Sequence, residues 1–409
     1  MPIITSLLDI DFYKFTMGQL VFHRSPEVPV KYAFKNRTSG VRLTDFIDEA
    51  ELRDELDHVR TLRFTNSDLH YLLGTDEYGA RMFSADYLAF LRELRLPDYY
   101  LEKNGDGYVT EFFGNWAEAI YWETIALAII NELYYRAKMA QLSRFGRDNV
   151  LAVGKCRLGE KIKALHRNPD IRFSDFGTRR RFSREWQDYV VNALREEVPE
   201  QFLGTSNVAL ANKYSLVPMG TSAHERDMAT ASILQSIGED IRKAQNIVLE
   251  DWWAEYGWGL SIALTDTWGT DFFFSQMTRE QAHSWKGLRQ DSGDPFAFAE
   301  KAIRFYRDKD INPKEKLLIF SDGLDVDTIV KLQSRFSRRI NLGFGWGTNL
   351  TNDLCFKPLS LVVKLVEANG QGTVKLSDNL AKATGRPADI RYYKRKLGYT
   401  GNTFQECRY

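Results

Sequence analysis

The chain has 409 residues, more than one hydrophobic core usually organises, so we expect two domains or a barrel with an appended domain. Its 55 Lys and Arg residues balance its 55 Asp and Glu residues, so no global charge favours nucleic acid or an anionic membrane as a partner. Three widely spaced cysteines, Cys156, Cys355 and Cys407, and the absence of a long apolar stretch predict a cytoplasmic protein without disulfides, secretion signal or membrane span.

Residues 1–140 are expected to form a separate α+β domain. Tyr108–Phe113 has the composition of a strand, and Trp116–Met139 has the apolar period of a buried helix. Near the other end of the chain, Leu359–Val366 is a further predicted strand, followed by a basic tail that contains Lys394, Arg395 and Lys396. We expect residues 360–409 to fold back on this first domain, which leaves residues 141–359 as a catalytic domain.

From residue 171 to residue 350, short β-prone runs alternate with polar turns and helix-compatible stretches. Right-handed crossovers between parallel strands place every strand-to-helix loop at one edge of the sheet. The pattern therefore predicts an α/β barrel with its active site in those loops. Two helix starts support it, a capping box at Thr278–Gln281 and a cap at Asp325. The predicted strands are Ile171–Phe173, Gln201–Leu203, Ser215–Val217, Leu260–Leu264, a weak one near Leu288, Leu317–Phe320 and Ile340–Phe344.

His224 ends the segment Gly-Thr-Ser-Ala-His, which follows a predicted strand and opens a predicted helix. Free backbone N–H groups and the positive end of the helix dipole suit this position to a phosphate, and a histidine there can accept a phosphoryl group as a nucleophile. A hydrogen-bonded structural histidine is an equally good interpretation of the residue type alone.

Asp175-Phe-Gly-Thr-Arg-Arg-Arg181 places three guanidinium groups behind an aromatic ring, directly after a predicted strand. Arginine binds carboxylate or phosphate with paired donors, and a phenylalanine face can stack on a flat heterocycle. An arginine run is more often a solvated surface. The preceding Phe-Gly and the strand-end position favour a binding site instead.

Three further loops have the residue types of a phosphate or metal site. Arg289 and Asp291 lie in a turn that can hold Mg²⁺ and a polyphosphate together, since Mg²⁺ takes one or two carboxylates and keeps water or substrate oxygens. Ser321-Asp-Gly323 and the glycine-rich run Gly343–Asn349 let a phosphate approach the backbone closely. Ordinary turns use the same residues, so each loop alone is a weak signal.

Taken in order, and together with Leu8-Asp-Ile-Asp-Phe-Tyr-Lys-Phe-Thr-Met17 and Gly347-Thr-Asn349, these segments resemble the nicotinate phosphoribosyltransferases. The resemblance covers most of the chain. It implies the type II phosphoribosyltransferase fold, an irregular α/β barrel with an α+β N-terminal domain. It also implies a head-to-tail homodimer with shared active sites, with nicotinate, phosphoribosyl pyrophosphate and ATP as substrates. Mg²⁺ would be the cofactor, and ATP hydrolysis would be coupled to nucleotide formation through a phosphohistidine.

The same resemblance implies roles for individual residues of this chain. His224 would carry the phosphoryl group, and Asp266 would orient its ring. Phe176 would stack on one face of the nicotinate ring and the partner subunit's Tyr13 on the other, while Arg179 would face the carboxylate. Arg37 would reach across the dimer to phosphates. The residues implied in binding phosphoribosyl pyrophosphate and its metal are Arg289, Asp291, Asp322, Gly323, Gly345, Gly347 and Thr348, with Asp291 as the metal ligand.

Ser206 bears on the choice between nicotinate and nicotinamide. The related nicotinamide-using enzymes carry Asp in this segment, and a carboxylate suits an amide N–H but repels a substrate carboxylate. Ser206 therefore favours the acid. The alternatives are a nicotinamide or quinolinate phosphoribosyltransferase, or a catalytically silent barrel that binds nucleotides. The presence of His224, Arg179, Arg289 and Asp291 argues against the silent barrel.

Overall fold

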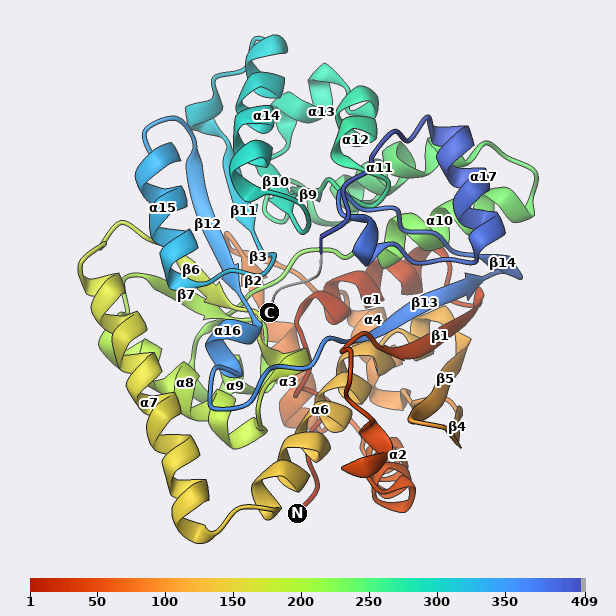
Figure 1. Ribbon diagram of the computed structural model, residues 1–409. Coiled ribbons are helices and arrows are strands. Elements are labelled where there is room, and N and C mark those ends of the chain that lie inside the picture. The colour runs from red at the N-terminus through yellow and green to blue at the C-terminus, as the bar shows by residue number, and fades with distance from the viewer. Residues whose placement is uncertain (406–409) are drawn as a thin grey trace.

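The computed structural model describes residues 1–405, so Cys407 and the end of the predicted tail lie outside the described residues. Most of its strands belong to two sheets in different parts of the molecule (Figure 1). One sheet is antiparallel, with five strands in the order β14-β13-β1-β5-β4. The other is parallel, with seven strands in the order β8-β7-β6-β12-β11-β10-β9. A short ribbon of β2 (Asp76–Glu77) and β3 (Ala80–Arg81) stands apart from both.

The antiparallel sheet joins the two ends of the chain. Its strands are β1 (Pro29–Asn36), β4 (Tyr99–Asn104), β5 (Gly107–Asn115), β13 (Leu361–Ala368) and β14 (Gln371–Gly372). The pairing of β13 with β1 returns the C-terminal part of the chain to the N-terminal sheet. The strands predicted at Tyr108–Phe113 and Leu359–Val366 lie within or overlap β5 and β13.

The N-terminal part contributes α1 (Tyr13–Arg24), α2 (Glu49–Thr61), α3 (Asn66–Gly74), α4 (Ala85–Glu93), α5 (Trp116–Ala119) and α6 (Trp122–Ala140). The single helix predicted over Trp116–Met139 is divided into α5 and α6, although Ile120 and Tyr121 keep right-handed helical angles. Residues 122–135 of α6 are all buried, as its apolar sequence predicts.

The predicted tail is divided between two places. β13 and β14 join the N-terminal sheet, whereas α17 (Pro387–Leu397) packs Tyr393 and Leu397 in a small apolar cluster with Trp268 and with Ala231 of α10. These two side chains are four positions apart, so they share one face of α17. The domain boundaries at residues 140 and 360 stay a prediction.

All seven predicted strands of the βα region overlap a strand of the parallel sheet. The observed strands are β6 (Phe173–Asp175), β7 (Phe202–Thr205), β8 (Val217–Pro218), β9 (Ile262–Leu264), β10 (Gly287–Gln290), β11 (Leu317–Phe320) and β12 (Asn341–Trp346). Within the described residues the edge strands β8 and β9 are not paired with each other, so the sheet is a curled half-barrel rather than a closed one.

Helices follow the strands and place the intervening loops at the carboxyl edge of the sheet. They are α7 (Arg144–His166), α8 (Arg184–Glu197), α9 (Val208–Tyr214), α10 (Glu225–Ser236), α11 (Ala244–Tyr256), α12 (Thr270–Gln276), α13 (Arg279–Ser284), α14 (Pro295–Asp308), α15 (Val326–Phe336) and α16 (Thr348–Thr351). Both predicted helix starts are confirmed: Thr278 and Gln281 form a capping box, and Asp325 accepts from the Thr328 amide at 2.7 Å. Among residues 1–405, no helix combines the length and apolar character needed to cross a bilayer.

A buried ion pair fastens the N-terminal segment to the loop after β6. The Arg181 guanidinium donates to both carboxylate oxygens of Asp9, at 2.6 and 2.8 Å, and both residues are almost fully buried. Close by, the Phe12 amide donates to the Ser206 carbonyl at 2.7 Å. Residues 9–13 are therefore held across the carboxyl ends of β6 and β7.

We predict that Arg181→Met lowers the free energy of unfolding by about 3–5 kcal/mol, because Asp9 would stay buried without its cation. Urea denaturation measures the loss. The double variant Arg181→Met/Asp9→Leu should recover most of it, since an apolar pair needs no desolvation of charge. A double variant as unstable as the single one would contradict this explanation.

Candidate active site

A pocket lies at the carboxyl edge of the parallel sheet, where the strand-end loops meet α1, α6 and β13. It brings together residues that are far apart in the sequence, and twelve of the fourteen predicted site residues line it. The predicted site residues that line it are Tyr13, Arg37, Phe176, Arg179, Ser206, His224, Arg289, Asp291, Asp322, Gly323, Gly347 and Thr348.

Asp266 and Gly345 are the two predicted site residues that do not line the pocket, whereas Asp11, which lines it, was not predicted. A methyl group on Gly345 would meet the Phe176 ring at 2.5 Å, so Gly345 makes room for that ring instead of facing a phosphate. The Phe176 amide in turn donates to the Trp346 carbonyl of β12 at 2.8 Å. β12 therefore sets the position of the ring that ends β6.

Tyr13 and Arg37 line the pocket of their own chain, and the contribution of a partner subunit's copies stays a prediction. Tyr13 opens α1, and its hydroxyl donates to Glu123 of α6 at 2.9 Å. The Arg179 guanidinium lies over the Tyr13 ring, 5.3 Å from its centre. One chain thus brings two aromatic rings, Phe176 and Tyr13, and a cation to the same pocket. We call the part of the pocket around Tyr13 and Arg179 the ring end.

A carboxylate also lies at the ring end. Asp11 is 3.1 Å from the Arg179 Nε and accepts from the Ser206 hydroxyl at 2.6 Å. Burial raises the pKa of Asp11, while Arg179 and Ser206 oppose the rise. Ser206 at its position therefore does not leave this part of the pocket free of carboxylates, and the argument that it alone selects an acid is too simple.

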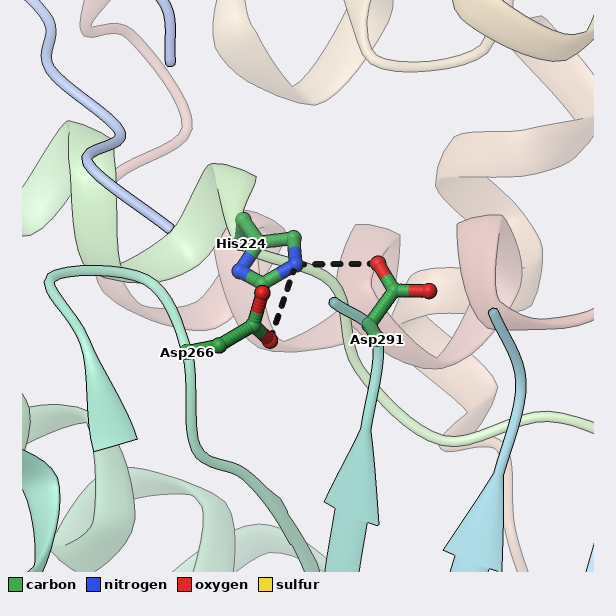
Figure 2. A group of neighbouring side chains, drawn as sticks. All are labelled: His224, Asp266 and Asp291. Atoms are coloured by element: carbon green, nitrogen blue, oxygen red, sulfur yellow. Dashed lines mark hydrogen bonds and ion pairs between the residues drawn. The ribbon is translucent and has the colours of Figure 1, made fainter. Parts of the chain in front are cut away.

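His224 immediately precedes α10 and points into the pocket beside two carboxylates (Figure 2). Its Nε2 lies 2.7 Å from Lys375 Nζ and 3.1 Å from Asp291 Oδ2. Burial, reinforced by the charge of Lys375, lowers the pKa of His224 to about 4, against the attraction of Asp266 and Asp291. The imidazole is therefore neutral at pH 7 and keeps a lone pair, as a nucleophile requires.

The ring of His224 contacts both Thr267 and Asp266, and Thr267 is the closer of the two. Nδ1 is hydrogen-bonded to the Thr267 hydroxyl at 3.0 Å, whereas Asp266 approaches only Nε2, at 3.6 Å. Asp266 instead accepts from Ser292 at 2.5 Å and pairs with Lys375 at 3.4 Å. Asp266 and Thr267 are adjacent in one loop, and Thr267 is the one that bonds the ring at Nδ1.

His224, Asp266 and Asp291 offer ligand atoms that all lie within 4.8 Å of one another. The two carboxylates suit Mg²⁺, and Asp266 Oδ1 is buried without a hydrogen bond. Although burial would raise it, the pKa of Asp291 is held well below its ordinary value by His224, Lys382 and Lys375. The donor set therefore fits a divalent cation that is shared with substrate oxygens.

The pocket also contains donors for phosphate. Arg289 donates to the Thr221 hydroxyl at 3.1 Å, while its Nε is buried without a hydrogen-bond partner. Gly323, Gly347 and Thr348 line the pocket nearby. Asp322 pairs with Lys382, whose ammonium also donates to the Asp291 carbonyl at 2.7 Å.

Several charged side chains of the pocket were missed in the sequence. Glu123, Lys364, Lys375 and Lys382 all line it, together with Asp11. The three lysines lie in the C-terminal segment that was expected to belong to the first domain, and Glu123 lies in a helix that was interpreted as plain core. The long-range pairing of β13 with β1 brings Lys364 to the pocket, and no local pattern signals it.

Residues 171–401 match the nicotinate phosphoribosyltransferase (NAPRTase) family, and residues 8–131 match the N-terminal domain of that family. The chain belongs to the nicotinate phosphoribosyltransferase family. Solved structures agree with this. A nicotinate phosphoribosyltransferase from Vibrio cholerae is 34% identical with a TM-score of 0.87, over 98% of this chain and 95% of that one.

Two further members of the family have the same fold. The nicotinate phosphoribosyltransferase of Porphyromonas gingivalis is 33% identical with a TM-score of 0.87, over 97% of this chain and 100% of its own. A putative nicotinate phosphoribosyltransferase of Saccharomyces cerevisiae is 32% identical with a TM-score of 0.86, over 98% and 99% of the two chains. The expected type II fold is thereby confirmed.

We predict that Gly345→Ala raises the KM for nicotinate by about tenfold, since displacing the Phe176 ring costs on the order of 1–3 kcal/mol. Gly343→Ala is the matched control on the same strand, because a methyl group there meets its nearest neighbours at 3.7 and 3.8 Å. Steady-state kinetics compare the two variants. Equal KM values for both would show that Gly345 does not position the ring.

Proposed function

We propose that the protein joins nicotinate to 5-phosphoribosyl 1-pyrophosphate, forming nicotinate mononucleotide and pyrophosphate in NAD salvage. One observation carries the proposal: two aromatic rings with Arg179, and Arg289 with a glycine-rich edge, line a single pocket. A flat acid and a phosphorylated sugar can therefore meet there. A cytoplasmic location remains part of the proposal.

In this reaction the bond from C1 of the ribose to pyrophosphate breaks, and its electron pair leaves with the pyrophosphate oxygen. The ring nitrogen of nicotinate supplies the pair for the new bond to C1. Phe176 and Tyr13 would hold the ring, and Arg179 would pair with its carboxylate. Arg289 would stabilise the charge on the leaving group. Mg²⁺, when held by Asp291, supplies further stabilisation of that charge.

ATP use is the second part of the proposal. The γ-phosphoryl group would pass from ATP to a ring nitrogen of His224 with ADP as the leaving group, and water would later release phosphate. The neutral imidazole and the neighbouring Lys375 support this step, since an ammonium can pair with the phosphoryl oxygens. A head-to-tail dimer also remains a proposal, although Tyr13 and Arg37 already line the pocket of their own chain.

Nicotinamide is the second candidate substrate, and Asp11 is the observation that favours it. Asp11 Oδ2 is buried without a hydrogen bond and can accept from an amide. Arg179 favours nicotinate, although its guanidinium already forms an ion pair with Asp11. Quinolinate would bring a second carboxylate beside Asp11 and is the least suited of the three.

We predict that the purified protein, given phosphoribosyl pyrophosphate, prefers nicotinate as the pyridine substrate. The kcat/KM for pyrophosphate release should be at least about 100-fold higher with nicotinate than with nicotinamide or quinolinate, because a buried charge left unpaired in the complex costs several kcal/mol. A coupled pyrophosphate assay makes the comparison. Preference for the amide would support the second candidate, and no release with any pyridine would support the silent barrel.

We predict that His224→Asn still forms nucleotide slowly but loses stimulation by ATP, because asparagine cannot accept the phosphoryl group. His283→Asn, at an exposed position in α13, is the control and should keep wild-type stimulation. Nucleotide formation is measured with and without ATP. Wild-type stimulation in His224→Asn would refute the coupling.

A further inference from the structure

A buried chain of charges, two of whose members line the pocket, has no part in the reaction described above. Lys14 of α1 is 2.8 Å from Glu123 of α6 and 2.7 Å from Glu225 of α10. The side chains of Lys14, Glu123 and Glu225 are 0%, 5% and 7% exposed. The three residues come from three helices.

The Glu123 end of this chain touches the ring end of the pocket. Glu123 accepts from the Tyr13 hydroxyl at 2.9 Å, and Arg179 lies 3.8 Å away. Tyr13 and Arg179 are the residues proposed to hold the ring and the carboxylate of nicotinate. A shift of Glu123 would therefore move the groups that hold the substrate.

The Glu225 end adjoins His224, which it follows directly in the chain. Glu225 is fixed further by the Tyr32 hydroxyl at 2.5 Å and the Trp116 indole at 2.8 Å. It is the first residue of α10, so its position also sets that of the histidine before it.

Because they are buried, the charged groups of this chain must stay paired with one another. Although burial alone would raise it, the pKa of Glu123 is held well below its ordinary value by Lys14, Lys364 and Arg179. A buried charge that loses its partner is strongly destabilising, so Lys14 must follow either carboxylate if one of them moves.

We propose that Glu123, Lys14 and Glu225 couple the ring end of the pocket to His224, with Glu123 as a positioning residue. The inference rests on the proposed use of ATP. Phosphorylation of His224 shifts the start of α10, and the shift reaches Tyr13 and Arg179 through Lys14. By reciprocity, a bound ring favours the same arrangement at His224.

Glu123→Gln tests the coupling, because glutamine keeps the shape and an acceptor for Tyr13 but loses the charge. The KM for nicotinate is measured without and with ATP, and the ratio of the two values is compared among variants. Coupling between two sites typically changes affinity by about 5- to 150-fold, and we expect the ratio of KM values in the wild type to lie in that range. In Glu123→Gln we expect the ratio to lie within about twofold of one. Glu132→Gln, on the same helix and also with a 5% exposed carboxylate, should keep the wild-type ratio.

A wild-type ratio in Glu123→Gln would overturn the coupling and leave the use of ATP intact. A ratio of one in the wild type, with no label from γ-labelled ATP on His224, would overturn both. Glu225→Gln removes the charge at the His224 end of the chain of charges and should also bring the ratio of KM values close to one. The coupling can therefore still be tested if Glu123→Gln does not fold. A wild-type ratio in Glu225→Gln would likewise overturn the coupling.

Discussion

The parallel pairing of β6 with β12 is the constraint on which the site depends. It joins segments from the beginning and the end of the βα region, and it sets the Phe176 ring against Gly345. The neighbouring strands then bring Arg289, Asp291 and Gly323 to the same edge. Because the sheet is a half-barrel and not closed, α1 and β13 complete the pocket from outside the sheet.

Several charged side chains of the pocket are already paired before any substrate binds. Arg179 faces Asp11 and Glu123, Lys375 faces Asp266 and His224, and Lys382 faces Asp322. Donors and acceptors are thus already oriented and largely dehydrated, so an anionic substrate exchanges one carboxylate partner for another instead of ordering loose side chains. Burial and the neighbouring ammonium of Lys375 together keep the imidazole of His224 neutral by lowering its pKa.

Much of the fold was predictable because each strand of the half-barrel carries a local signal, an apolar run before a polar turn. Of the twelve lining residues that were predicted, Tyr13 belongs to the N-terminal motif, Arg37 follows β1, and the others lie in or beside those turns. Glu123 and the lysines were not predictable, since a buried acid in an apolar helix and a lysine in a tail have no local mark. The resemblance also did not show that Tyr13 lines the pocket of its own chain, or that Thr267 bonds the His224 ring at Nδ1.

The most direct measurement is a crystal structure of the protein with nicotinate bound. The account predicts the pyridine ring between Phe176 and Tyr13, with its carboxylate against Arg179. Its nitrogen should face the part of the pocket that contains Arg289. A ring bound elsewhere, or with its carboxylate turned away from Arg179, would contradict it.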